Sequence, residues 1–299
     1  MRKLLTETLK LRDEMRATQP RVSTDLRTSP LSDTHRPRII PMNTASRIRL
    51  LVLIASFMVQ MVSAAAAESQ ENAQKRVMLW LEAGPAWQSY NDVQIPASTG
   101  TRFSISDFGK GPFAAWRVYA GYQLSDKSGL RLLLAPLSVT VTGTPSSALS
   151  YQNTTFAAGV PTDALYKFNS YRLTYQYKFH ESDTLALRIG FTAKIRDAEI
   201  RLTQGALTAA RTDLGFVPLL NFVLDWRFNP GWALVLDADA LAAPQGRAED
   251  VALQLGRDLT PDLQLRAGYR MVEGGSSGGG SVYSFAWFHY ATLGVLYRL

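Results

Sequence analysis

YSFAWFHYATLGVLYRL, residues 283–299, is the stretch that decides the fold. From Tyr283 onward every second side chain is apolar or aromatic apart from His289, whereas the positions between them include Thr292 and Arg298. A period of two residues is typical of a strand with one apolar face. The stretch is longer than the ~5–6 residues of an ordinary strand, and a tilted strand in a membrane barrel needs about 9–11 alternating residues. The pattern therefore predicts a membrane-crossing strand at the C-terminus.

This stretch resembles the closing strand of bacterial outer-membrane β-barrel proteins, which usually ends in an aromatic residue. Here the last residue is Leu299, and Tyr297 stands two positions before it, so the alternation matches while the final residue departs from the pattern. The resemblance implies contact with outer-membrane lipid and recognition of the last strand by the barrel-assembly machinery.

The overall composition is that of a folded protein, with 46% hydrophobic and 19% charged residues. The formal net charge of +7 is concentrated in residues 1–49, which hold eleven Lys or Arg and five Asp or Glu. The rest of the chain is nearly neutral, so we do not expect nucleic acid as a partner. The absence of Cys excludes disulfides and Cys-based metal or nucleophile chemistry.

A secretory signal peptide is predicted for residues 42–67. Arg47 and Arg49 precede a run of thirteen apolar or uncharged residues, 50–62, and the small residues 65–67 supply a cleavage site. The run is shorter than the ~20 residues of a membrane helix. Residues 1–41 are interpreted as a disordered or mis-assigned upstream extension, with a genuine cytosolic extension as the alternative. The expected location is the outer membrane of a Gram-negative-type bacterium after removal of the signal.

Residues 68–299 are predicted to form an all-β domain, an up-and-down antiparallel transmembrane β-barrel of ten strands. Short turns alternate with long connections, as in outer-membrane barrels. Eight strands are the alternative, because residues 247–258 are weakly apolar. A soluble barrel or sandwich is a further alternative, because its strands would also alternate. Local bulges are expected at Pro85, Pro136 and Pro218, since proline cannot donate to a ladder. The expected strands are 76–91, 112–125, 129–142, 164–180, 184–202, 213–228, 231–243, 247–258, 262–273 and 283–299.

Two aromatic groups favour lipid over a soluble core, one near the short turns, such as Trp226 and Phe228, and one near the long loops, such as Trp87 and Trp287. The phase opposite the apolar face carries charges and is assigned to the lumen. The candidate lumen charges are Glu82, Arg117, Arg172, Arg188, Lys194, Asp225, Arg227, Asp237, Asp239, Arg266 and Arg270, and the same phase also carries Arg131, Lys178, Arg196 and Asp250.

These charges allow two interpretations. A barrel of about eight strands is just filled by side chains, so the first is a structural or surface-exposed barrel whose lumen is largely filled by ion pairs. The second is a narrow channel for small polar or anionic solutes, because an excess of Arg and Lys falls on the second to fifth strands, where no acid is expected to face it.

A barrel-embedded hydrolase is the third interpretation. Asp237 and Asp239 on one face of a strand resemble the paired Asp of omptin proteases, but His180 and His289 are not expected beside them. His289 also resembles the His of the His-x-Ser in lipid A deacylase barrels, where Ala291 replaces the nucleophile. Neither constellation is complete, so no catalytic residue, cofactor or metal ligand is predicted.

Overall fold

The computed structural model describes residues 76–299. The expectations for residues 1–41 and for the signal peptide at 42–67 fall outside the described residues. None of the helical segments within 76–299 has the length and apolar character that a membrane-crossing helix needs.

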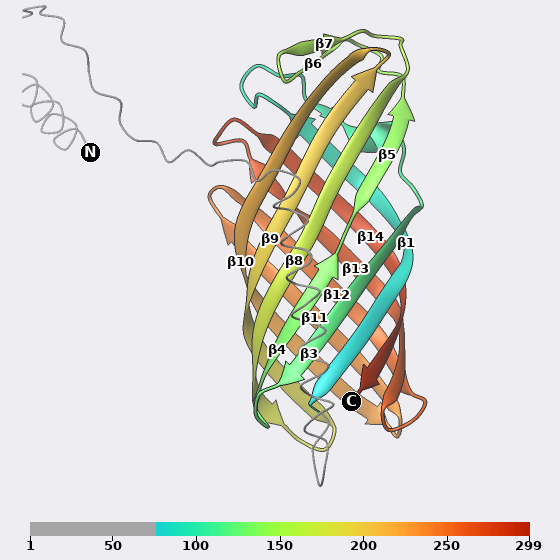
Figure 1. Ribbon diagram of the computed structural model, residues 1–299, viewed down its shortest axis with the longest axis vertical. Coiled ribbons are helices and arrows are strands. Elements are labelled where there is room, and N and C mark those ends of the chain that lie inside the picture. The colour runs from blue at the N-terminus through green and yellow to red at the C-terminus, as the bar shows by residue number, and fades with distance from the viewer. Residues whose placement is uncertain (1–75) are drawn as a thin grey trace, which may run out of the picture. The chain divides into compact units, whose positions relative to one another are not determined.

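Ten antiparallel strands form a closed barrel (Figure 1). Consecutive strands pair with each other, and pairing of the last strand with the first closes the ring. The third strand is interrupted, so that its two segments, β4 and β5, both pair with β8. The barrel strands are β1 (Val77–Gln94), β3 (Phe113–Gln123), β4 (Ser128–Ala135) with β5 (Ser138–Gly143), β8 (Thr162–Glu181), β9 (Leu185–Gln204), β10 (Leu207–Asn229), β11 (Trp232–Ala243), β12 (Gly246–Asp258), β13 (Leu263–Ser277) and β14 (Tyr283–Arg298).

The predicted ten-stranded up-and-down barrel is confirmed, and the eight-stranded alternative is wrong. The weakly apolar stretch at 247–258 is β12, which pairs with β11 on one side and β13 on the other. Its few apolar residues reflect its place in the ring, because one of its faces looks into a polar part of the lumen.

The two ends of the barrel differ. At the turn end lie both the start of β1 and the end of β14, with the short connections 124–127, 182–184, 230–231 and 259–262. At the loop end, residues 95–112 include β2 (Phe103–Ser104) and the 3-10 helix η1 (Ile105–Asp107). Residues 144–161 include β6 (Leu149–Tyr151) and β7 (Thr154–Phe156), which pair only with each other.

One predicted loop is part of a hairpin instead. Residues 203–212 were expected to connect two strands, but the pairing of β9 and β10 continues to Gln204 opposite Leu207. Gly205 supplies the positive φ, 58°, that such a two-residue turn needs. The walls formed by β8, β9 and β10 are therefore longer than the sequence pattern indicated.

Of the three expected proline bulges, only Pro136 interrupts a strand, between β4 and β5. At Pro85 the register of β1 with β14 is the same on both sides, and the shift comes at Ser89 instead. Pro218 keeps its pairing with Ala193. The predicted bulges at Pro85 and Pro218 are therefore wrong. Pro85 forms no ladder pair with β14 and Pro218 forms none with β11, so the missing N–H group of each proline leaves no ladder bond unmade on that side.

The outer face of the barrel is apolar. Leu220 and Leu293 are 59% and 58% exposed, and Phe222 is 37% exposed, so the predicted apolar phase points outward. Exposed aromatic side chains gather toward both ends, with Trp226 and Phe228 near the turn end and Trp87 near the loop end. An apolar band with aromatic residues on both sides is the surface that a bilayer selects.

Part of the inner face is also apolar, which the sequence analysis did not anticipate. At the loop end a buried cluster includes Val139, Tyr166, Ile200 and Phe288. A smaller cluster nearer the turn end contains the stacked rings of Trp80 and Tyr119, whose centroids are 4.1 Å apart. The lumen is thus divided along its length into apolar and charged levels.

Candidate functional site

A charged belt crosses the middle of the lumen. It consists of four carboxylates and four guanidinium groups, and each of these residues is at most 8% exposed. The formal charges of the belt cancel, and each member lies within 4.0 Å of an opposite charge. Members of the charged belt are Glu82, Asp237, Asp239, Asp250, Arg117, Arg131, Arg172 and Arg270.

Asp250 is the centre of the belt, because three arginines from three different strands donate to it. Arg117 Nη1 lies 2.9 Å and Arg172 Nη2 2.6 Å from Oδ2. Arg270 Nη1 lies 2.5 Å from Oδ1. Charge-assisted hydrogen bonds of this length are strong, so one carboxylate holds β3, β8 and β13 against β12.

Glu82 and Arg270 form the second part of the belt. Arg270 Nε donates to Glu82 Oε1 at 2.9 Å and Nη2 donates to Oε2 at 3.1 Å, a bidentate pair between β13 and β1. Gln254 Nε2 also donates to Glu82, at 2.9 Å. The Tyr119 hydroxyl accepts a hydrogen bond from Arg270 at 3.0 Å.

Asp237 and Asp239, the paired carboxylates on β11, are both occupied by donors. Arg131 donates to both oxygens of Asp237, at 2.6 and 3.1 Å. Asp239 accepts from Arg172 at 2.7 Å and from Thr192 at 2.7 Å. Asn221 lies between the two carboxylates and donates to each of them. The pair therefore has the surroundings of a structural site.

The structure brings together six of the eleven predicted lumen charges and separates the other five. The six in the charged belt are Glu82, Arg117, Arg172, Asp237, Asp239 and Arg270. Outside the belt lie Arg188, Lys194, Asp225, Arg227 and Arg266. The neutral members of the network, such as Asn221 and Gln254, were missed, although they share the inward phase of the same strands.

The belt pairs charges across the lumen. The sequence analysis left the basic residues of the second to fifth strands without facing acids, but Arg117 and Arg172 reach Asp250 on the opposite wall, and Arg131 reaches Asp237. That expectation was wrong because a narrow lumen lets long arginine side chains reach strands that are distant in the ring.

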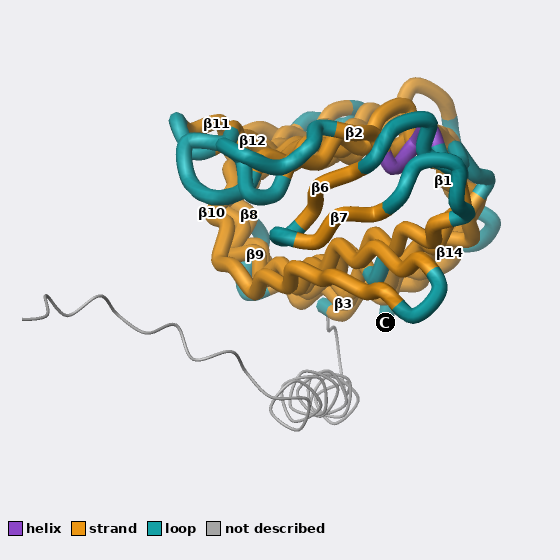
Figure 2. The backbone as a smooth tube through the Cα atoms, turned by 90° about the horizontal axis from the view of Figure 1, so that it is seen from above, coloured by secondary structure: helices purple, strands orange, loops and turns teal. Residues whose placement is uncertain are grey.

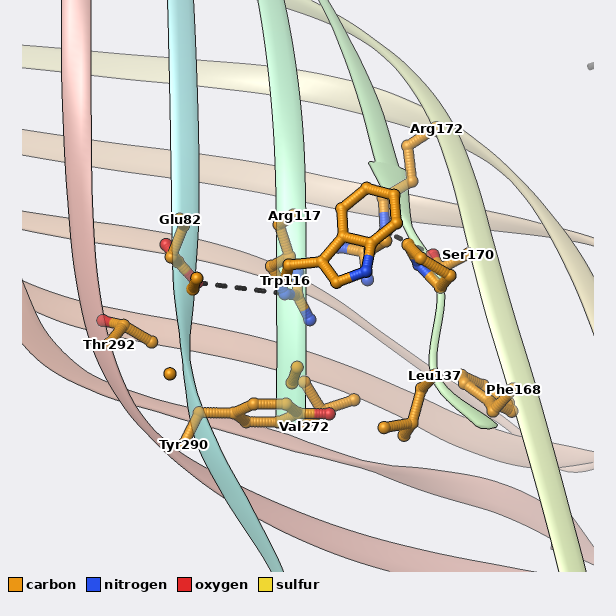
Figure 3. Close-up of a pocket in the computed structure, with 15 residues that line it drawn as sticks. Glu82, Trp116, Arg117, Leu137, Phe168, Ser170, Arg172, Val272, Tyr290 and Thr292 are labelled. Carbon is orange, nitrogen blue, oxygen red and sulfur yellow. Dashed lines mark hydrogen bonds and ion pairs between the residues drawn. The ribbon is translucent and has the colours of Figure 1, made fainter. Parts of the chain in front are cut away.

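A small cavity of about 20 Å³ borders the belt on its loop-end side, which is room for about one water molecule. Figure 3 shows Glu82 and Arg117 facing each other across two strands, with Arg172 beside Ser170. Leu137, Phe168, Val272 and Tyr290 lie on the other side of the cavity (Figure 3). The change from charged to apolar lining is therefore abrupt.

The turn-end vestibule is a cavity of about 300 Å³ below the belt. Arg188, Asp225 and Arg266 line it, together with the belt residues Arg131 and Asp237. Arg266 donates to Gln264 at 2.7 Å, and its guanidinium carbon lies 4.9 Å from the centroid of the Trp80 ring. Arg227 pairs with Asp258 at 2.9 Å, in an exposed position. This end of the lumen is therefore polar and lined by several basic side chains.

The loop-end chamber is a cavity of about 420 Å³ above the belt. Aromatic and aliphatic side chains form most of its wall, and two basic residues of β9 reach it. Its main lining residues are Tyr166, Phe168, Lys194, Phe216, Leu241 and Phe288. The volume is within the range of small-molecule sites, about 300–1,000 Å³.

The β6–β7 hairpin lies across the loop end, inside the outline of the ring in a view down the barrel (Figure 2). Tyr151 and Phe156 are fully buried, and the Tyr151 hydroxyl donates to the carbonyl of Ile200 at 2.8 Å. Thr101 donates to the carbonyl of Ser150 at 2.8 Å, which ties the hairpin to the loop 95–102. The loop end is thereby covered by apolar packing.

His289 does not lie near the paired carboxylates. Its Nε2 is 2.5 Å from Ser89 Oγ and its Nδ1 is 2.5 Å from the Tyr269 hydroxyl. Ala291 was the expected nucleophile position, but the hydroxyl beside His289 belongs to Ser89, at the register shift of β1. Ser89, His289 and Tyr269 thus form a group of three. Within residues 76–299 no carboxylate contacts His289. The same residues contain no group of three or more His, Asp or Glu that could hold a metal ion.

No protein-family model matches the chain, and no curated protein matches its sequence. Solved structures with a similar course of the chain include the outer membrane protease OmpT from Escherichia coli, with 11% identity and a TM-score of 0.41 over 78% of this chain and 99% of that one. Neisserial surface protein A has 16% identity and a TM-score of 0.34 over 77% of this chain and 100% of that one. Ail of Yersinia pestis has 12% identity and a TM-score of 0.35 over 75% of this chain and 99% of that one.

These similarities concern the fold alone. Independently of them, residues 76–299 form a closed antiparallel ring with an apolar outer face and charged residues in its lumen. Only helices and closed barrels leave no unpaired backbone group facing lipid. The chain has the general architecture of bacterial outer-membrane β-barrel proteins.

Proposed function

We propose that this protein is an integral outer-membrane barrel with a structural or surface role, whose lumen the charged belt closes to solutes. The observation that carries the proposal is the complete mutual pairing of four buried carboxylates and four buried arginines across the middle of the ring. A hydrated ion passing this level would have to displace charge-assisted hydrogen bonds, which are among the strongest in proteins.

The location in the outer membrane, after removal of a signal peptide, is part of the same proposal. Its support is the outer face, where large apolar side chains stay exposed along whole strands, as at Leu173, Phe191 and Leu293. The turn end would then face the periplasm and the loop end the outside, which is the arrangement of this class of barrel. The surrounding outer-membrane lipid is the partner of the apolar face, and β14 is the segment that the barrel-assembly machinery would recognise.

A charge on the apolar face tests the location. Leu220→Arg is expected to lower the free energy of unfolding from lipid vesicles by about 2–4 kcal/mol, because an arginine near the bilayer midplane is costly. Val160→Arg, a control in the loop 157–161 whose parent side chain is also apolar and exposed, is expected to change it by less than about 0.5 kcal/mol. Urea unfolding followed by tryptophan fluorescence measures both. Equal effects of the two substitutions would contradict insertion of this face into lipid.

Conductance in planar bilayers tests the closed lumen. The unmodified barrel is expected to give no single-channel steps. The paired variant Glu82→Ser with Arg117→Ser keeps the charge balance and shortens two side chains that approach within 3.9 Å in the belt, so steps are expected from it. The matched control Asp92→Ser with Arg102→Ser removes an exposed pair at the loop end and is expected to stay silent. Steps from the unmodified barrel would overturn the proposal.

The second candidate function is a narrow channel for small anionic or polar solutes. The turn-end vestibule favours it, because Arg188 and Arg266 line the vestibule without a carboxylate ion pair among the described residues. Basic groups at the mouth of a pore favour anions. In that case the unmodified barrel would conduct and its current would be selective for anions.

We propose no catalytic role. Asp237 and Asp239 each accept two or more hydrogen bonds from Arg, Asn or Thr side chains, which leaves neither of them free to act as a general base. His180 and His289 are not among their contacts, and Ser89 and His289 lack the carboxylate that would orient a catalytic histidine.

A further inference from the structure

Lys194 is a buried basic side chain with which no carboxylate of the belt pairs. It is 3% exposed and lies on β9, directly opposite Arg172 in the pairing of β8 and β9. Like charges at opposed positions repel each other. Within residues 76–299 the Lys194 ammonium makes no ion pair or hydrogen bond, and Nζ lies 4.6 Å from the centroid of the Phe168 ring. An ammonium group is costly to bury without a partner, so a carboxylate placed beside Nζ would stabilise the protonated form of Lys194.

The space beside Lys194 is the loop-end chamber. Lys194 and Phe168 belong to its lining near the belt, and Tyr166 and Phe288 contribute aromatic walls. The other basic residue of β9 in the chamber, Arg196, is already paired with Asp213. Arg247 at the rim is paired with Glu273. A chamber with apolar walls and one basic group that has no acidic partner among the described residues is complementary to an apolar molecule with one acidic group.

The wall of the chamber is incomplete between β10 and β11. Their pairing begins at Leu220 opposite Ala240 and continues only toward the turn end. Above this level β10 pairs with β9 alone, and Leu241 to Ala243 pair with β12 alone. Val217 and Pro218 on one side and Leu241 and Ala243 on the other line the chamber. Since Phe216 and Leu220 are 61% and 59% exposed on the apolar outer face, the gap joins the chamber to the lipid-facing side.

We propose that the loop-end chamber binds one molecule of a monocarboxylic amphiphile, of the fatty-acid class, with its carboxylate on the Lys194 ammonium and its hydrocarbon body against the aromatic walls. A single carboxylic acid matches the single unpaired amine, whereas a phosphate monoester carries about −1.5 to −2 at neutral pH. The apolar gap between β10 and β11 favours an occupant that comes from the lipid phase. The proposal does not depend on whether the charged belt conducts.

Equilibrium dialysis of radiolabelled decanoate against the folded barrel in lipid nanodiscs tests the site, with empty nanodiscs correcting for partition into lipid. One decanoate per barrel is expected. Lys194→Met is expected to raise the dissociation constant about tenfold to hundredfold, because it removes a hydrogen bond to a charged group. Binding of decanol, which has the same body without the charge, is expected to be weaker than that of decanoate and the same in both proteins.

Arg188→Met is the matched control, because Arg188 lies on the same strand in the same inward phase but lines the turn-end vestibule. It is expected to leave decanoate binding unchanged. Lys194→Gln provides a second variant, and heat-modified electrophoretic mobility shows that each protein is folded. The proposal is overturned if the unmodified barrel binds no decanoate, if decanol binds as tightly as decanoate, or if folded variants at Lys194 bind decanoate as well as the parent does.

Discussion

Asp250→Asn is expected to lower the free energy of unfolding by about 3–5 kcal/mol, because it removes a counter-charge that three buried arginines share. Arg117, Arg172 and Arg270 all donate to this carboxylate, and all three are buried. Asparagine has nearly the same shape, so the packing of the lumen is retained while one negative charge is lost. The neutral belt would then carry a net positive charge in a region from which water is largely excluded. Urea unfolding in lipid vesicles, followed by tryptophan fluorescence, measures the change.

The control for Asp250 is Asp258→Asn at the turn end. Asp258 accepts from Arg227 at 2.9 Å, but the side chains of the pair are 43% and 20% exposed. Exposed pairs contribute about 0–1 kcal/mol, so a loss of at most that size is expected. The double variant Asp250→Asn with Arg117→Met also removes the arginine that has no hydrogen bond to another carboxylate, and part of the lost stability is expected to return. Equal losses at Asp250 and Asp258 would show that the belt is hydrated, and the proposal of a closed lumen would lose its physical basis.

The sequence predicted the fold because alternation is a local property. In β14 and in β10 the apolar side chains at every second position face outward, and the pattern that places Leu220, Phe222 and Leu293 there can be read from neighbouring residues alone. Two of the turns at the turn end are likewise local, since Pro230 with Gly231 and Pro261 restrict their backbone. The weakly apolar β12 is also a strand, because a closed ring requires a pairing partner on the free edges of both β11 and β13.

The arrangement of the lumen could not be predicted in the same way. Alternation tells which face a side chain is on, but it does not give the height of the side chain along the barrel or its partner on the opposite wall. Asp250 and Arg117 are far apart in the chain and in strand order, and only the closed ring brings them within 2.9 Å. The apolar residues of the inner face, such as Tyr166 and Phe288, were missed because an aromatic residue in the inward phase has no local signal that separates it from one at an interface.

The closing seam between β1 and β14 also depends on a feature that the sequence pattern does not reveal. The ladder pairs Ala83 with Leu293 and Ala86 with Tyr290, and no pair is formed at the two positions between them. At one of these positions, a Cβ atom on Gly84 would lie 1.9 Å from the carbonyl oxygen of Ala291. Glycine is thus required for space, because the backbone of β14 approaches β1 more closely here than any side chain allows.

Gly84→Ala is therefore expected to destabilise the barrel by at least about 3 kcal/mol, at the upper end of what overpacking costs, because the obstructing atom belongs to the backbone and cannot turn away. The sign of the change in stability is informative, since alanine within a strand is otherwise about 0.5–1 kcal/mol more stabilising than glycine. Gly121→Ala on the adjacent β3 is the control, because the nearest atom to its new Cβ would be the flexible end of Met78, at 3.0 Å, and the backbone stays at 3.7 Å. This variant is expected to be neutral or stabilising. Unfolding in urea and the yield of heat-modifiable folded barrel measure both variants. If Gly84→Ala were as stable as Gly121→Ala, β1 and β14 could move apart at Gly84 without a loss of stability. The ladder pairs on either side of Gly84 would then be sufficient to close the ring.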